Sequence, residues 1–524
     1  MCALRFNVEG RAWSRRRILQ LGGAAIAWPL LGPAASALAR RNVSGGDYPF
    51  TLGVASGDPS PDGFVIWTRL APKPLEGGGM PSENVEVRWQ VADDDKFTKI
   101  VAEGRATATP ELAHAVHVEV PGLEPNRWYF YRFEGAKELS PIGRARTAPK
   151  ADEQPERLRF AFASCQHYES GLFTAYKHMA EEDLDLVAHL GDYIYEYPGK
   201  ENQVRKHVGP LLDLLVDYRN RHAQYKTDEH LQAMHAKCPW IVTWDDHEFA
   251  NNCAGLISEK PEETTAMYTR RRVNAYRAYY EHMPLRARQV PQGPSMRLYR
   301  NVSFGKLAEF AVLDTRQYRT DQPCGDGNKP PCYEALSKRG TLLGKTQEEW
   351  LYKTLDRSEA KWNVLTQQVM MGRVDRTVGE VKAYSMDQWP GYEANRLRVL
   401  EYFAENPEQN NVVITGDIHT NYVNDLQVDS ADEKSPVVAT EFVGTSISSG
   451  GDGVEKRNDT DEMLKENPFV KWFNAERGYV SCELTPKQWS SFYRTVPFVT
   501  KPGAPLVTRK AFVVEAGKPG AQEI

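Results

Sequence analysis

Much of this chain repeats the pattern of one stretch, Leu184-Asp185-Leu186-Val187-Ala188-His189-Leu190-Gly191-Asp192-Tyr193-Ile194-Tyr195-Glu196. An apolar run over residues 184–190 is followed at once by a turn that carries a carboxylate and a phenol. Short apolar runs of this length are typical of strands that are buried on both faces, as in parallel sheets. The stretch therefore predicts a buried strand with Asp192 and Tyr195 just beyond its carboxyl end.

Similar apolar runs recur along the second part of the chain. They cover residues 158–163, 239–244, 307–313, 362–365 and 411–414. Residues 268–280 and 347–355 have helical patterns between them. Buried strands that alternate with helices indicate an α/β layered domain, which we place at residues 157–510.

The first part of the chain has a different period. Apolar and polar side chains alternate over residues 85–91, and residues 115–120 and 128–133 are further β-prone runs. Turn formers such as Pro121-Gly122 separate these segments. Short strands at this spacing are typical of a β-sandwich. We therefore expect a small all-β sandwich domain at residues 47–150, with a polar linker up to residue 156.

Chemically active side chains follow the apolar runs of the α/β domain. Beyond Asp192 and Tyr195, these segments are Ser164-Cys165-Gln166, Asp245-Asp246-His247-Glu248, Asp314-Thr315-Arg316 and Gly416-Asp417-Ile418-His419. The loops at the carboxyl ends of strands form the ligand crevice of open α/β sheets. One such loop means little, because Asp and His also cap helices and turns. Several together predict a metal site.

The donor types restrict which ions the site suits. Thiolate, phenolate and imidazole suit a redox-capable ion such as ferric iron, whereas carboxylates suit calcium, manganese or magnesium. Asp192 is the natural bridge between two ions, because Tyr195 reaches from the same loop. Two neighbouring ions suit the hydrolysis of phosphoesters.

These segments resemble the PhoD family of alkaline phosphatases, secreted relatives of the purple acid phosphatases and other metallophosphoesterases. The resemblance extends over residues 47–450 and includes the following further motifs: Phe50-Thr51-Leu52-Gly53-Val54-Ala55-Ser56-Gly57-Asp58-Pro59, Trp67-Thr68-Arg69-Leu70, Leu313-Asp314-Thr315-Arg316-Gln317-Tyr318-Arg319 and Trp389-Pro390-Gly391-Tyr392. It implies a β-sandwich before a four-layer αββα metallophosphoesterase core. It also implies one Fe(3+) and Ca(2+) as cofactors. The segment after about Gly450 matches less clearly.

The resemblance also implies roles for individual residues. Cys165, Asp192, Tyr195 and His419 would hold iron, and Asp192, Asp246 and Asp417 would hold calcium. His247 would donate a hydrogen bond or proton to the ester oxygen. Arg316 would pair with phosphate, or alternatively form a structural ion pair. Gln368, Glu441 and Asn251 are possible outer ligands.

The N-terminus has the features of a twin-arginine signal peptide at residues 1–39. Ser14-Arg15-Arg16-Arg17 precedes a short apolar stretch, and Ala37-Leu38-Ala39 follows it. We therefore expect the twin-arginine export machinery as a partner and a periplasmic or secreted location, with no stable transmembrane anchor. In this oxidising setting, Cys324 and Cys332 are a candidate disulfide, and Cys238 with Cys253 a weaker one.

The net charge of −5 over 524 residues argues against a nucleic-acid-binding module. The leading hypothesis is an exported alkaline phosphatase that hydrolyses small-molecule phosphate monoesters for phosphate acquisition, with diesters as a second substrate class. A phosphodiesterase directed at phospholipid or teichoic-acid-like polymers is the alternative within the family. A non-catalytic envelope binding protein is the alternative from another class.

Overall fold

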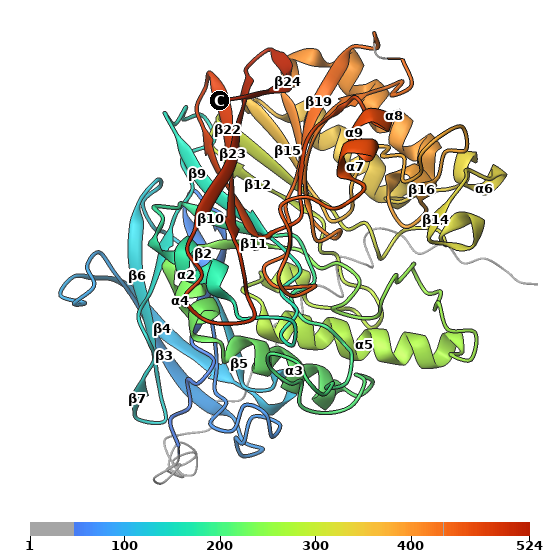
Figure 1. Ribbon diagram of the computed structural model, residues 1–524. Coiled ribbons are helices and arrows are strands. Elements are labelled where there is room, and N and C mark those ends of the chain that lie inside the picture. The colour runs from blue at the N-terminus through green and yellow to red at the C-terminus, as the bar shows by residue number, and fades with distance from the viewer. Residues whose placement is uncertain (1–46, 433) are drawn as a thin grey trace, which may run out of the picture. The chain divides into compact units, whose positions relative to one another are not determined.

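The computed structural model describes residues 47–432 and 434–524. They form an α/β structure around two large sheets, of ten and seven strands (Figure 1). The predicted α/β class is therefore confirmed. The predicted signal peptide, residues 1–39, lies outside the described residues.

The ten-stranded sheet has the order β24-β23-β22-β21-β9-β10-β11-β1-β2-β5. Its strands are β1 (Val54–Ser60), β2 (Gly63–Arg69), β5 (Ala115–Val120), β9 (Leu158–Ala163), β10 (Leu186–His189), β11 (Trp240–Val242), β21 (Arg477–Leu484), β22 (Gln488–Val496), β23 (Val507–Glu515) and β24 (Lys518–Glu523). The central strands β9, β10 and β11 pair in parallel. These three strands are the first three apolar runs of the sequence.

The seven-stranded sheet has the order β12-β13-β15-β17-β19-β18-β20. Its strands are β12 (Arg300–Phe304), β13 (Ala308–Val312), β15 (Trp362–Thr366), β17 (Asn411–Thr415), β18 (Asn421–Gln427), β19 (Val437–Val443) and β20 (Val470–Asn474). Strands β13, β15, β17 and β19 are parallel to one another. The remaining three apolar runs are β13, β15 and β17.

Alternate residues of β9 explain how the two sheets pack. Phe160 and Phe162 belong to the core between the sheets, where Phe160 meets Phe310 of β13 with ring centroids 5.2 Å apart. Ala161 and Ala163 point to the opposite face and join a core shared with helices. Burial of a phenylalanine contributes about 1.5–3 kcal/mol, so this period-2 pattern fixes which face of β9 meets the other sheet.

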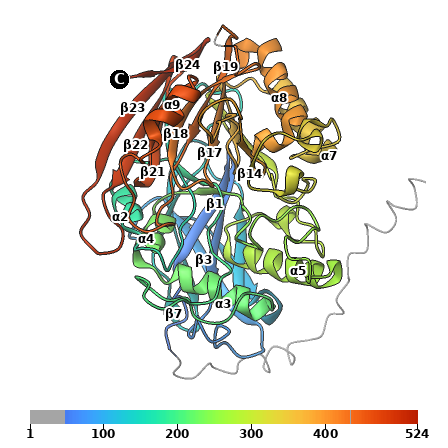
Figure 2. The same ribbon diagram turned by 45° about the vertical axis from the view of Figure 1, so that its right-hand side comes forward.

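Helices cover the outer faces of both sheets. The helices α2 (Thr174–Glu181), α3 (Leu215–Lys226), α4 (Glu229–Lys237) and α5 (Thr265–His282) contribute to the core on the ten-stranded sheet. The helices α7 (Gly344–Arg357) and α8 (Glu393–Glu405) contribute Leu351 and Leu400 to the core on the seven-stranded sheet. Figure 2 shows α7 and α8 on the side away from β22 and β23.

The N-terminal region is not self-contained. The strands β3 (Val85–Ala92), β4 (Ile100–Ala108), β6 (Trp128–Gly135), β7 (Glu138–Leu139) and β8 (Gly143–Arg146) form a separate five-stranded sheet. This sheet shares a core with Phe64 and Ile66 of β2. However, β1 pairs in parallel with β11, so β1, β2 and β5 extend the ten-stranded sheet instead of closing an independent sandwich.

The segment after Gly450 also joins this framework. β21 pairs with β9 antiparallel, and β22 to β24 extend the sheet outward. The short strands and α-helices that remain are β14 (Asn328–Lys329), β16 (Tyr384–Ser385), α6 (Tyr333–Leu336) and α9 (Thr460–Glu466). None of the helices in the described ranges is long and apolar enough to cross a membrane.

The cysteines confirm one of the two candidate disulfides. Cys324 is bonded to Cys332. Cys238 and Cys253 are both buried free thiols, so the weaker candidate pair is wrong. Cys238 follows α4 and packs in the helix-side core, where a small apolar side chain is sufficient.

Candidate metal centre

The predicted site residues lie in loops beyond parallel strands of both sheets. Cys165 follows β9, Asp192 and Tyr195 follow β10, and Asp246 follows β11. From the seven-stranded sheet, Asp417 and His419 follow β17, and Arg316 follows β13. Because the carboxyl ends of these strands meet at one edge, residues up to 254 positions apart converge.

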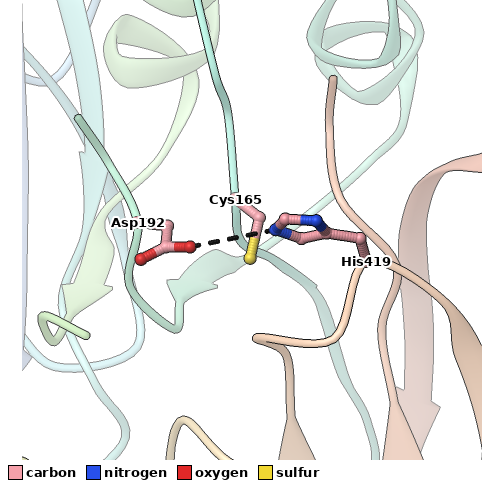
Figure 3. A group of neighbouring side chains, drawn as sticks. All are labelled: Cys165, Asp192 and His419. Carbon is pink, nitrogen blue, oxygen red and sulfur yellow. Dashed lines mark ion pairs between the residues drawn. The ribbon is translucent and has the colours of Figure 1, made fainter. Parts of the chain in front are cut away.

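Four side chains form a cluster of mixed donors, namely Cys165, Asp192, Tyr195 and His419. Donor atoms of Cys165, Asp192 and His419 lie within 4.8 Å of one another (Figure 3). The Tyr195 hydroxyl donates to Asp192 Oδ2 at 2.8 Å and lies 3.2 Å from His419 Nε2. We call this group the mixed-donor cluster.

Three aspartates form a second group, the carboxylate cluster. Oxygens of Asp245, Asp246 and Asp417 lie within 4.8 Å of one another. Asp192 and Asp246 also fall within this distance of each other, together with His247, so the two clusters adjoin. The geometry thus offers two neighbouring positions for cations.

Two glycines permit this close approach. A Cβ at Gly191 would lie 2.4 Å from the Asp245 Cβ, and one at Gly416 would lie 2.3 Å from Ser164 Oγ. Any larger residue would therefore push apart the loops that carry the donors.

The backbone is strained at the donors themselves. Cys165, Asp192, Asp417 and His419 all have positive φ, at 58°, 54°, 66° and 56°. This conformation costs non-glycine residues about 1–2 kcal/mol each. Such strain persists where the surroundings hold it in place, and its concentration at these two adjoining clusters is a feature of functional sites.

The electrostatics of the donors favour bound cations. Burial raises the pKa of Asp192 well above its ordinary value, and Asp246 and Asp245 add to this effect. Burial also raises the pKa of Asp417 to about 6. The Oδ1 of Asp246 and the Oδ2 of Asp245 are buried without a hydrogen-bond partner in the described part of the chain. Crowded, partly unpartnered carboxylates of this kind gain most from positive ions.

The mixed donors fit a cation as well. Burial raises the pKa values of the Cys165 thiol and the Tyr195 phenol, and a nearby cation reverses such a shift by stabilising the anions. Burial lowers the pKa of His419 to about 3, so its imidazole is neutral, as metal ligation requires. The residues present therefore fit a metal ion.

His247 lies beside both clusters and is held by Glu196. Its Nδ1 lies 2.7 Å from Glu196 Oε2. Burial lowers the pKa of His247, but Asp246, Glu196 and Asp192 together raise it well above its ordinary value. The Glu196 contact fixes the ring and leaves Nε2 for another partner.

Arg316 is occupied by carboxylates. Its Nε donates to Asp245 Oδ1 at 2.5 Å, its Nη1 donates to Asp387 at 2.8 Å, and its Nη2 lies 3.3 Å from Asp417. The side chain is only 1% exposed. The geometry favours the structural ion pair over the phosphate contact that the sequence also suggested.

The three suggested outer ligands have other partners. Gln368 bonds to Thr315 and Thr243, and Glu441 accepts from the backbone NH groups of Met371 and Gly372. The Asn251 amide donates to Glu259 at 3.1 Å. All three side chains therefore form structural hydrogen bonds with neighbouring segments.

Sequence reasoning missed several supporting residues. Glu248 accepts from the backbone NH groups of Asp192 and Asp245, at 3.1 and 2.9 Å, and so ties two donor loops together. Ser449 donates to the Tyr195 hydroxyl at 2.7 Å. The position of Glu248 at the end of a recognised motif was a usable signal, whereas Ser449 lies in a segment without one.

Comparison with known proteins agrees with this arrangement. Residues 160–493 match the family model described as PhoD-like phosphatase, and residues 35–149 match its N-terminal domain. The chain belongs to the PhoD-like phosphatase family. It is 53% identical over 482 residues to a Bacillus subtilis (strain 168) protein named alkaline phosphatase D, covering 91% of this chain and 82% of that protein.

A solved structure titled "Structure of PhoD" resembles the chain over the same extent. The two share 53% sequence identity with a TM-score of 0.89, and the match covers 91% of this chain and 92% of the other. The fold is therefore that of the family.

Proposed function

We propose that this protein is an exported, metal-dependent alkaline phosphatase that hydrolyses phosphate monoesters for phosphate acquisition. The observation that carries the proposal is the meeting of the mixed-donor cluster and the carboxylate cluster at Asp192 and Asp246, in a chain of the PhoD-like phosphatase family. Two adjoining cations suit phosphoester hydrolysis, because they can stabilise both the attacking and the leaving oxygen.

The donor chemistry supports ferric iron at the mixed-donor cluster, held by Cys165, Asp192, Tyr195 and His419. Oxygen donors support calcium at Asp192, Asp246 and Asp417. When bound, these ions supply Lewis acidity at the phosphoryl group. Asp245 is instead paired with Arg316.

His247 would assist departure of the alcohol. Glu196 engages Nδ1, so Nε2 is the nitrogen that can donate to the leaving ester oxygen. The ring centroid of His247 lies 4.2 Å from that of Tyr195, with the two rings tilted by 30°, and this contact further limits its rotation. His247 thus acts as a fixed donor next to the phosphoryl group, while Arg316 holds the aspartates.

The finer architecture and location belong to the same proposal. Helices on the outer faces of two packed sheets support a four-layer αββα core within a catalytic domain at residues 157–510. We assign residues 47–150 to an N-terminal module whose strands β1, β2 and β5 form one edge of the ten-stranded sheet. The features of residues 1–39 support export by the twin-arginine machinery to the periplasm or the exterior.

The test is turnover of chromogenic esters by the mature protein loaded with iron and calcium. We expect hydrolysis of the monoester at alkaline pH, and loss of this activity in Asp192→Ala but not in Asp152→Ala, an exposed control. Faster turnover of the diester would favour the phosphodiesterase alternative. If neither ester releases phosphate, the result would favour the alternative of a non-catalytic envelope binding protein.

A further inference from the structure

One buried cation beside the mixed-donor cluster has no carboxylate partner. Arg477, the first residue of β21, is 7% exposed. Its Nη1 donates to the His419 carbonyl at 2.6 Å and its Nε donates to the Gly451 carbonyl at 2.8 Å. Within residues 47–432 and 434–524, no carboxylate oxygen lies within 4.0 Å of its guanidinium nitrogens.

This environment is the reverse of that of Arg316. Four aspartates lie within 4.0 Å of the Arg316 guanidinium and neutralise it, and its side chain is closed off from solvent. Arg477 is held only by backbone carbonyls, which fix its direction without neutralising its charge. A buried charge without a counter-ion is costly, so such an arginine is suited to an anionic ligand.

The third guanidinium nitrogen of Arg477 is the one available for a ligand. Nη2 has no hydrogen bond to any described residue, yet it is not among the buried unpartnered atoms, so solvent reaches it. It lies over Gly450, where a Cβ would be only 2.9 Å away. The preceding residue, Ser449, donates to the Tyr195 hydroxyl. Nη2 therefore lies at the loop that touches the mixed-donor cluster.

We propose that Arg477 is a further catalytic residue, whose Nη2 donates to a non-bridging oxygen of the phosphoryl group bound at the metal centre. The planar guanidinium, fixed by two carbonyls, presents this donor in a set orientation, which a flexible lysine does not. The inference rests on the proposed function, and it moves the phosphate contact from Arg316 to Arg477.

The experiment measures binding of inorganic phosphate to the metal-loaded protein by titration calorimetry, together with its iron and calcium content. We expect Arg477→Gln to weaken phosphate binding by about 10–100-fold, the range for a charged hydrogen bond, and to keep both metals. Arg477→Lys should recover only part of the affinity. The matched control is Arg494→Gln on the adjoining strand β22, which removes an arginine paired with Glu182.

A second variant keeps the test valid if Arg477→Gln fails to fold. Gly450→Ala retains the charge but places a methyl group against Nη2, and we expect weaker phosphate binding with both metals retained. Unchanged phosphate affinity in Arg477→Gln would overturn the inference. Loss of iron from Arg477→Lys would also overturn it, because the arginine would then serve only to hold His419.

These outcomes are separate from a failure of the proposed function. Wild-type protein that binds phosphate through Arg477 but hydrolyses no ester would contradict the phosphatase assignment and leave the anion site in place.

Discussion

The two adjoining clusters differ in both donors and supports. The mixed-donor cluster combines sulfur, phenol, imidazole and a carboxylate, and the neutral Ser449 hydroxyl donates to its phenol. The carboxylate cluster contains only aspartates and is held by the charged Arg316. The difference shows that one crevice can present two unlike donor sets, and ion preference depends on the donors and not on the fold.

The largest expected effect on turnover comes from replacing a donor in one cluster at a time. His419→Ala should remove iron and retain calcium, whereas Asp417→Asn should lower calcium and retain iron. Each should reduce turnover by about 10²–10³-fold, the usual cost of losing one group that stabilises charge in the transition state. Elemental analysis and monoester turnover of the two variants provide the check. Loss of both metals from both variants would show that the clusters are not separable.

The next largest effect tests whether the phenol is a donor of the mixed-donor cluster. Tyr195→Phe removes the phenol that contacts Asp192 and His419. A tyrosinate on ferric iron gives a visible charge-transfer band, so we expect the wild-type colour to disappear while calcium remains. Turnover should fall by about 10–100-fold, comparable with the loss of a group that orients metal ligands. An unchanged visible spectrum would exclude Tyr195 as a ligand.

A smaller effect tests His247, which lies between the clusters. Glu196→Gln replaces the carboxylate at Nδ1 with an amide of the same size and should keep both metals. We expect kcat to fall by about 10-fold and the alkaline limb of the pH–rate profile to shift to lower pH, since an anionic partner raises the pKa of a histidine. Steady-state kinetics over a range of pH measure both quantities. A loss confined to metal content would refute the orienting role.

The parallel strands at the centre of the two sheets were predictable from sequence, whereas the pairing of the strands at the sheet edges was not. Buried runs such as residues 158–163 lie within a residue or two of the observed strands, because burial on both faces leaves a continuous apolar signal. The strands β1 and β2 carry no sign of which sheet they join. Their pairing with β11 is a long-range choice that local pattern does not contain.

The same limit applies to the site. Cys165, Asp192 and His419 were predictable because each follows an apolar run, and convergence of strand ends is a general rule. Arg316 was ambiguous, since the partners that occupy it, such as Asp387, come from a distant segment. Arg477 had no signal, because it begins strand β21 and follows none of the apolar runs that precede the other site residues. The family model does extend over this segment, to residue 493.

The smallest effect concerns Lys226, a buried cation that belongs to neither cluster. Lys226 is buried over the Trp67 ring, and burial lowers its pKa to about 7. The unfolded chain then binds more protons between pH 7 and about 10.4, so stability rises with pH over this window and falls as pH drops through 7. Lys226→Met should flatten this dependence of the free energy of unfolding, as denaturant titrations at pH 7 and pH 10 would measure. A rise as steep as that of wild type would assign the dependence to other groups.

The central claim is that Cys165, Asp192, Tyr195 and His419 hold iron while the neighbouring aspartates hold calcium. Anomalous diffraction from crystals of the metal-loaded protein, collected on both sides of the iron absorption edge, tests it most directly. The account predicts an edge-dependent peak in contact with the Cys165 sulfur and the Tyr195 oxygen, and an edge-independent ion beside Asp246 and Asp417. An iron peak away from Cys165, or none at either cluster, would contradict it.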